Sequence, residues 1–130
     1  MCGGTDSLIL SQDFLNFPLP LMKHEHEQRK ESMQMGDRRI LSESECTAAL
    51  TSLPGWSIQN RRLRREFTFA DFSLAFSFMV RVAMVAEQMS HHPDWSNVYN
   101  RVTIELTTHD LGGISTFDVE FARKTNALLG

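Results

Sequence analysis

Residues 71–106 read DFSLAFSFMVRVAMVAEQMSHHPDWSNVYNRVTIEL, and this stretch decides the fold. Its first half repeats apolar residues at spacings of three and four, which is typical of a helix with one buried face. Asp71 is a good N-cap for this helix, which we expect to end near Met89, before Pro93. The apolar stripe is expected to comprise Phe72, Ala75, Phe76, Met79, Val80, Ala83 and Ala86.

The second half of the stretch changes to a period of two. From Val98 to Leu106, apolar and polar residues alternate, which predicts one long strand with one buried face. Leu111-Gly112-Gly113 predicts a turn after this strand. Residues 114–116 are then expected to form a short edge strand, or none.

Two further helices are predicted on either side of this stretch. Ser42 and Glu45 have the spacing of a capping box, in which each side chain bonds the other residue's backbone N–H. Ser115 and Asp118 have the same spacing. The helices are expected at about 42–52, ended by Pro54-Gly55, and at about 118–129.

Residues 56–59 and 63–69 predict a hairpin, with its turn at Asn60-Arg61. The order of elements is therefore helix, hairpin, helix, strand, short strand and helix, without a βαβ repeat. Helices packed on one face of an antiparallel sheet, an α+β fold, satisfy this order. Residues 39–130 are expected to form this domain, and residues 1–38 a poorly ordered N-terminal extension.

Composition narrows the class of protein. The chain has 130 residues, 42% of them hydrophobic, and a formal net charge of −3, which suits one soluble domain with no general attraction for nucleic acid. No apolar run approaches the roughly 20 residues of a membrane helix, so we expect no membrane contact and a cytoplasmic location. Cys2 and Cys46 lack metal-binding spacing, and we interpret both as free thiols.

Three of the five histidines lie between Ser90 and Asp110. His91 and His92 follow the predicted helix and His109 follows the predicted strand, where a scaffold typically displays reactive side chains. Glu87 precedes His91 by four residues, so the two would share a helix face if the helix continued. Because imidazole both gives and takes protons near neutrality, this cluster indicates acid–base chemistry.

Other interpretations stay open from the residues alone. Histidines at the ends of elements are often capping or surface residues. Histidine and carboxylate are also zinc or iron ligands, although HExxH is absent and adjacent His91 and His92 tend to point apart. Trp95 and Tyr99 could wall a pocket for a flat ring or simply pack beside the helix end. The remaining aromatic residues are expected in the core: Trp56, Phe67, Phe69, Phe72, Phe76 and Phe78.

The basic cluster Arg61-Arg62-Leu63-Arg64-Arg65 is expected to be a solvated hairpin face or a subunit contact. It could in principle touch phosphates, but Glu66 adjoins it and no aromatic platform is evident.

The run EQMSHHPDWSNVY at 87–99, followed by TTHD at 107–110 and by Asp118, resembles the signature of the pterin-4a-carbinolamine dehydratases. This family includes dimerisation cofactors of a homeodomain transcription factor. The signature is an acidic residue, His-His-Pro, an aromatic residue, a third histidine and a later aspartate. Residues 53–56 and 67–83 also match, so the resemblance covers about residues 40–128.

The resemblance implies a four-stranded antiparallel sheet with three helices on one face. It implies dimers through the sheets and often tetramers through the central helices. The implied activity is that of a hydro-lyase, which dehydrates 4a-hydroxytetrahydrobiopterin to quinonoid dihydrobiopterin and recycles the pterin of aromatic amino acid hydroxylases. No metal and no organic cofactor is implied.

By position, the resemblance implies the site residues. The implied catalytic residues are Glu87, His91, His92 and His109. The implied pterin-binding residues are Ser90, His91, His92, Thr107, Thr108, His109 and Asp110. Our hypothesis is that His91 and His109 share the acid and base work while His92 orients the pterin.

Two alternative functions remain. Some animal members of the family bind and stabilise the dimer of a homeodomain factor through a helical surface, which implies a coactivator, alone or as a second role, and a nuclear location as well. The third hypothesis is a metal-dependent enzyme. Metal analysis of the purified protein separates it from the metal-free mechanism.

Overall fold

A computed structural model describes residues 37–130. The expectation of a poorly ordered extension at residues 1–38 falls almost entirely outside the described residues. The described elements, in chain order, are α3 (Glu43–Leu50), β1 (Ser57–Gln59), β2 (Arg62–Thr68), α4 (Phe72–Met89), β3 (Asp94–Val98), β4 (Arg101–Leu106) and α5 (Thr116–Ala127).

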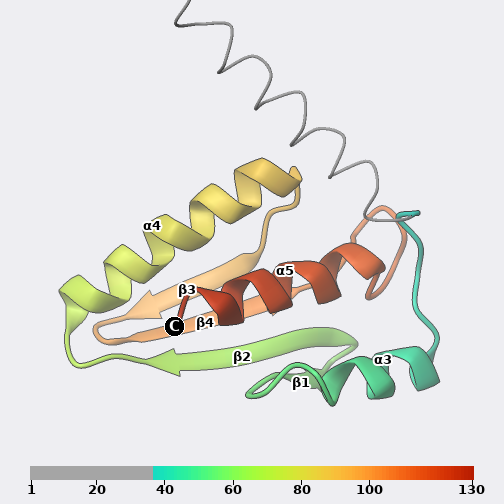
Figure 1. Cartoon of the computed structure of the whole chain (residues 1–130), viewed down its shortest axis with the longest axis horizontal. Coiled ribbons are helices and arrows are strands. Elements are labelled where there is room, and N and C mark those ends of the chain that lie inside the picture. Colours follow the sequence, from blue (N-terminus) through green and yellow to red (C-terminus); the bar gives the residue numbers. More distant parts are fainter. Residues whose placement is uncertain (1–36) are drawn as a thin grey trace, which may run out of the picture. The chain divides into compact units, whose positions relative to one another are not determined.

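The four strands form one antiparallel sheet in the order β1-β2-β4-β3. α4 and α5 pack against each other, α4 contacts β4 and α5 contacts β2. Figure 1 shows the two long helices side by side along the sheet. These features confirm the α+β fold with a four-stranded antiparallel sheet and three helices.

The single long strand predicted from Val98 to Leu106 is wrong. The chain reverses at Tyr99-Asn100, where Tyr99 has a left-handed φ of 52°, and β3 and β4 then pair with each other. The alternation of apolar and polar residues runs on through the turn, so the pattern does not reveal the reversal. β3 is therefore the fourth strand. Residues 114–116 contribute only an isolated bridge between Ile40 and Ser115.

Val119, Phe121 and Ala122 of α5 complete a core that is formed mainly by the inner face of the sheet and one face of α4. The strands bury Leu63, Phe67, Val102, Ile104 and Leu106, and the helix buries Ala75, Phe78, Val82, Ala86 and Met89. The predicted stripe was wrong in part, because Phe72, Phe76 and Val80 are exposed on another side of α4. α4 is apolar on more than one face, and its spacing alone does not show which face meets the sheet.

Both predicted capping boxes are present, at Ser42 with Glu45 and at Ser115 with Asp118, and Asp71 caps α4 as expected. α5 begins at Thr116 rather than at residue 118, since the helix starts directly after its cap. α3 and α5 each end two residues before the predicted position.

Within residues 37–130, α4 alone has the length and mean hydropathy, 1.3, that a membrane span would need. The sequence-based expectation was that no apolar run approaches the length of a membrane helix, and the 18 residues of α4 come closer to that length than expected. Core helices of soluble proteins pass the same test. Part of this apolar character belongs to the inner face of α4, which packs on β4 and α5.

Candidate active site

The three histidines gather because four element ends meet at one end of the domain. β3 begins where β4 ends, since Asp94 lies opposite Glu105 in the sheet. Figure 1 shows the last turn of α4, the loop after β4 and the first turn of α5 at this same end. His91 and His92 leave α4 there, and His109 lies in the loop after β4.

A sharp turn after α4 separates the two adjacent histidines. Ser90 is the left-handed C-cap of the helix, with φ of 49°, and the N–H of His91 donates to the carbonyl of Ala86. Glu87 and His91 would share a helix face only if the helix continued to His91, and this condition is not met, because α4 ends at Met89. The expectation that the two imidazoles point apart is confirmed: His91 is 7% exposed, whereas the His92 side chain is 65% exposed.

His91 is fixed by a buried carboxylate. Its Nε2 lies 2.6 Å from Oδ1 of Asp118, which is fully buried. Oδ2 of Asp118 accepts from the hydroxyl of Thr108 at 2.8 Å and from the N–H of Ser115 at 2.8 Å. A buried carboxylate needs such partners, because removing a charge from water is costly. Asp118 therefore joins the end of α4, the loop after β4 and the start of α5.

The other two histidines face carboxylates at the surface. Nε2 of His92 lies 2.7 Å from Oε1 of Glu87. Nε2 of His109, whose side chain is 69% exposed, lies 3.4 Å from Oδ2 of Asp94, and this oxygen also accepts from Arg62 at 2.7 Å. In all three pairs Nε2 faces the acid, which leaves Nδ1 as the other ring nitrogen for proton transfer.

The remaining predicted pterin-binding residues differ in their surroundings. Thr108 is buried and its hydroxyl donates to Asp118, so it helps to hold the carboxylate that binds His91. Ser90 and Asp110 are exposed, and Thr107 is half-buried. Tyr99 lies at the opposite end of β3 from the histidines, so its predicted role as a pocket wall there is wrong. Trp95 directly follows Asp94 and lies near the histidine end of β3.

Sequence reasoning missed Arg38, which lies in the segment assigned to the extension. Its guanidinium makes two hydrogen bonds to Asp110, at 2.6 and 2.7 Å. These bonds hold the pKa of the Asp110 carboxyl below its ordinary value, because they stabilise the ionised form. Within the described residues, no group of three histidine, cysteine or acidic side chains is placed to bind one metal ion.

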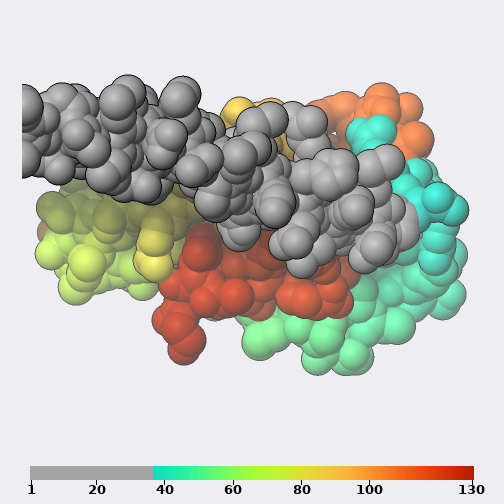
Figure 2. All heavy atoms as spheres, turned by 45° about the horizontal axis from the view of Figure 1, so that its top comes forward, coloured from blue at the N-terminus to red at the C-terminus, as the bar shows by residue number. Residues whose placement is uncertain are grey.

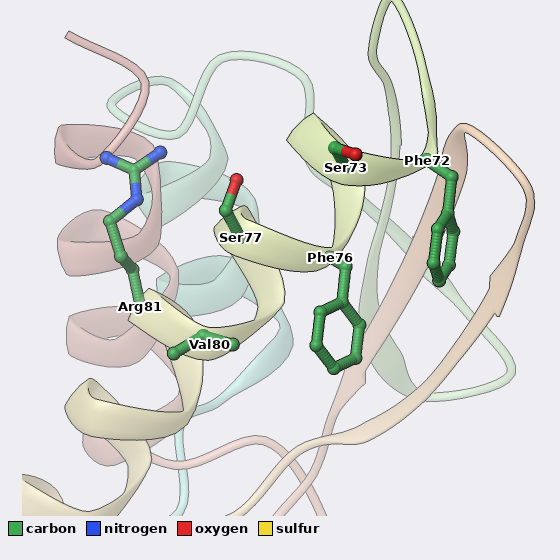
Figure 3. Close-up of a pocket in the computed structure, with 6 residues that line it drawn as sticks. All are labelled: Phe72, Ser73, Phe76, Ser77, Val80 and Arg81. Atoms are coloured by element: carbon green, nitrogen blue, oxygen red, sulfur yellow. The ribbon is translucent and has the colours of Figure 1, made fainter.

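A hollow lies on the exposed face of α4 and is lined by Phe72, Ser73, Phe76, Ser77, Val80 and Arg81 (Figure 3). The rings of Phe72 and Phe76 stack there with centroids 5.7 Å apart. These residues belong to the first ten residues of α4, whereas the histidines follow its last turn. The hollow is therefore separate from the histidine site, and the core predicted for these two aromatic residues is wrong.

Comparison with known proteins identifies the family of this chain. The family model for pterin 4 alpha carbinolamine dehydratase matches residues 39–128. A protein of Synechococcus sp. (strain WH7803), provisionally named a pterin-4-alpha-carbinolamine dehydratase, is 57% identical over 89 residues, which cover 68% of this chain and 96% of that protein. A protein of Solibacter usitatus with the same provisional name is 54% identical over 88 residues, covering 68% and 93%.

A crystal structure from Brucella melitensis, described as a transcriptional coactivator/pterin dehydratase, superimposes with a TM-score of 0.67. It shares 46% identity and covers 69% of this chain and 98% of that chain. The matched region contains both the sheet and all three histidines. The chain therefore belongs to the pterin 4 alpha carbinolamine dehydratase family.

Proposed function

We propose that this chain dehydrates 4a-hydroxytetrahydrobiopterin to quinonoid dihydrobiopterin and water. The observation that carries the proposal is the set of three histidines at one end of the domain, each with Nε2 facing a carboxylate. Family membership supplies the substrate class. The geometry supplies groups that can give and take protons near neutral pH.

The reaction needs two proton transfers and no external electrons. The N5 lone pair forms the C4a–N5 double bond, the C4a–O bond breaks, and the hydroxyl leaves as water after a general acid has protonated it. A base then receives the proton that N5 releases. A carboxylate at Nε2 fixes the orientation of the imidazole, so the ring is held for proton transfer through Nδ1. No metal or organic cofactor enters this scheme.

We assign the proton transfers to His91 and His109 and the orientation of the pterin to His92, with Glu87 holding the His92 ring. Asp118 fixes His91, so this imidazole offers one edge in one orientation. His109 is exposed and held more loosely, which suits a group that meets the departing hydroxyl. Ser90, Thr107 and Asp110 surround the histidines in sequence and would contact the ring edges.

The test is dehydration of freshly generated 4a-hydroxytetrahydrobiopterin, with the quinonoid product followed optically. We expect His91→Ala and His109→Ala to lower kcat by about 100-fold or more, as loss of a general acid or base does. His92→Ala should mainly raise KM. Tyr99→Ala, at the far end of β3, is the control and should match the wild type. Folded wild-type protein no faster than the spontaneous reaction would refute the proposal.

We propose further that the protein acts in the cytoplasm, where it recycles the pterin of aromatic amino acid hydroxylases, and also in the nucleus if it has a homeodomain partner. The reaction supports this role, because its product is the oxidised pterin that a reductase returns to the hydroxylase. Dehydratase activity confined to a membrane fraction of the source cells would contradict the proposed location.

We also propose that the chain forms dimers through the edge of β3 and tetramers through α4. The supporting observation is the exposed apolar surface of α4, which comprises Phe72, Leu74, Phe76, Val80 and Met84. Phe76→Glu should convert tetramers to dimers in light scattering without loss of activity, whereas Lys124→Glu on α5 should change neither. Monomers from the wild type at micromolar concentration would contradict the proposal.

A second candidate function, that of a coactivator which binds a homeodomain factor, is favoured by the same surface and by the description of the Brucella melitensis structure. It predicts that a partner helix competes with tetramer formation and that Phe76→Glu abolishes partner binding. A tetramer that does not exchange with any homeodomain dimerisation segment would exclude this role.

A further inference from the structure

The short segment 37–41 lies against the start of α5. The backbone N–H of Leu41 donates to the carbonyl of Ile114, and that of Thr116 donates to the carbonyl of Arg39. The hydroxyl of Thr116 donates to the carbonyl of Asp37. Figure 2 shows this segment, in cyan, beside the orange loop that follows β4.

Arg38 extends from this segment to the neighbours of two site histidines. It binds both carboxylate oxygens of Asp110, which directly follows His109. Its guanidinium carbon also lies 5.8 Å from the ring centroid of Phe117, within the range of a cation–π contact. The Phe117 ring in turn lies edge-on to the His91 ring, with centroids 6.0 Å apart.

The loop after β4 is anchored at its base but has few anchors at its tip. Backbone hydrogen bonds between Thr108 and Gly113 close the base. Among residues 37–130, the tip at 109–111 has two side-chain ties, which are the bidentate pair of Asp110 with Arg38 and the longer contact of His109 with Asp94. The Arg38 pair is the shorter of the two and has two parallel bonds, so it restrains direction as well as distance.

We propose that Arg38 is a positioning residue of the active site, which holds Asp110 and thereby places His109 opposite the His91 that Asp118 fixes. The inference rests on the proposed dehydratase function. Arg38 lies one residue before the region that the family model matches, at 39–128. The site of this chain would therefore depend on a residue outside the part that defines its family.

The other interpretation is that Arg38 merely fastens segment 37–41. The neighbouring residue provides the matched control, because Arg39 makes a bidentate pair of the same kind with Glu45 at the start of α3. Both pairs are exposed, and exposed ion pairs add little to stability. The two arginines therefore differ chiefly in whether their partner adjoins a histidine.

The experiment compares full-length Arg38→Ala, Arg38→Lys and Arg39→Ala in kcat, KM and thermal midpoint. We expect Arg38→Ala to lower kcat about 10-fold with KM within about twofold, since small misplacements of a reacting group are costly. Lysine keeps the charge but not the two-pronged geometry, so it should restore only part of kcat. Arg39→Ala should keep the wild-type kinetics. Equal kinetics in Arg38→Ala and Arg39→Ala would overturn the proposal.

Two further measurements separate a positioning role of Arg38 from a merely structural one and from the proposed dehydratase function. Asp110→Ala should lower kcat at least as much, and the double variant with Arg38→Ala should lose no more than Asp110→Ala alone, because Arg38 acts through Asp110. Additive losses would contradict the proposal. Hydrogen exchange of residues 108–113 should quicken in Arg38→Ala and not in Arg39→Ala. Hydrogen exchange does not require turnover. It therefore tests whether Arg38 restrains this loop even if the wild type is not a dehydratase.

Discussion

Two regions of the site contain the same chemical pair in opposite surroundings. His91 and Asp118 meet in the interior, where the imidazole is 7% exposed and the carboxylate is fully buried. His92 with Glu87, and His109 with Asp94, meet at the surface, where each imidazole is more than half exposed. Water screens the surface pairs, whereas the interior pair has no other partner for its charge but the protein.

This difference teaches what each pair contributes. Asp118 bonds to His91, Thr108 and Ser115, so one side chain serves as both helix cap and site support. The surface pairs are exposed to water, so the stability of the fold depends little on them. A dehydratase with this site would combine one imidazole of fixed orientation with two that can adjust to the substrate.

Asp118→Asn should show the largest effect. The amide nitrogen cannot accept the hydrogen bonds that Oδ1 or Oδ2 now receives, so a buried donor loses its partner. We expect the free energy of unfolding to fall by about 3 kcal/mol, as it does when a buried pair is broken. With His91 released, kcat should also fall by about 100-fold or more. Urea denaturation and steady-state kinetics measure the two effects.

The control for this variant lies on the same helix. Thr125 is fully buried, and its hydroxyl has no hydrogen-bond partner within the described residues. Thr125→Val keeps the volume and removes a polar atom, so stability should stay constant or rise by about 1 kcal/mol, with unchanged kinetics. If both variants lost equal stability, general disturbance of α5 rather than the Asp118 contacts would be the cause.

The fold was predictable from the sequence wherever a local signal had one meaning. Ser42, Asp71 and Ser115 marked helix starts correctly because an N-cap needs a short oxygen-bearing side chain at one position. The reversal at Tyr99 was missed, since it uses a left-handed residue other than glycine and the alternation continues through it. The buried face of α4 was assigned in part wrongly, because the apolar residues of this helix lie on more than one of its faces.

For the candidate site, the sequence predicted which histidines lie together but only part of their geometry. The resemblance named all three histidines and Asp118, but it did not show that Asp118 pairs with His91 and Glu87 with His92. Those pairings depend on the left-handed turn at Ser90 and on the packing of α5, which are tertiary features. Arg38 lay beyond the pattern altogether, and its arginine–aspartate contact spans 72 positions along the chain.

Glu87→Gln and Asp94→Asn test the surface pairs, and their effect should be intermediate. Each removes the negative charge from one imidazole and keeps the side-chain shape. We expect kcat/KM to fall by about 3- to 10-fold, which corresponds to the net contribution of a typical hydrogen bond, about 0.5–1.5 kcal/mol, with no change in thermal midpoint. For Glu87→Gln the loss should lie mainly in KM, and for Asp94→Asn mainly in kcat. A large loss of stability in either variant would erase the contrast with Asp118.

The smallest expected effect concerns the exposed pairs of segment 37–41 in acid. Hydrogen bonds from Arg39 and from the N–H of Ser42 lower the pKa of Glu45 from its ordinary 4.5 to about 2, and Arg38 lowers the pKa of Asp110. A carboxyl whose pKa is lower in the folded state stabilises the fold above its unfolded pKa. That contribution is lost as the pH falls from about 5 to about 2. Urea midpoints between pH 6 and pH 2.5 should therefore decline less steeply in Glu45→Gln than in the wild type, while the pH dependence of kcat stays the same. Parallel midpoint curves would show that Glu45 adds nothing to acid stability and would leave the decline to other carboxylates.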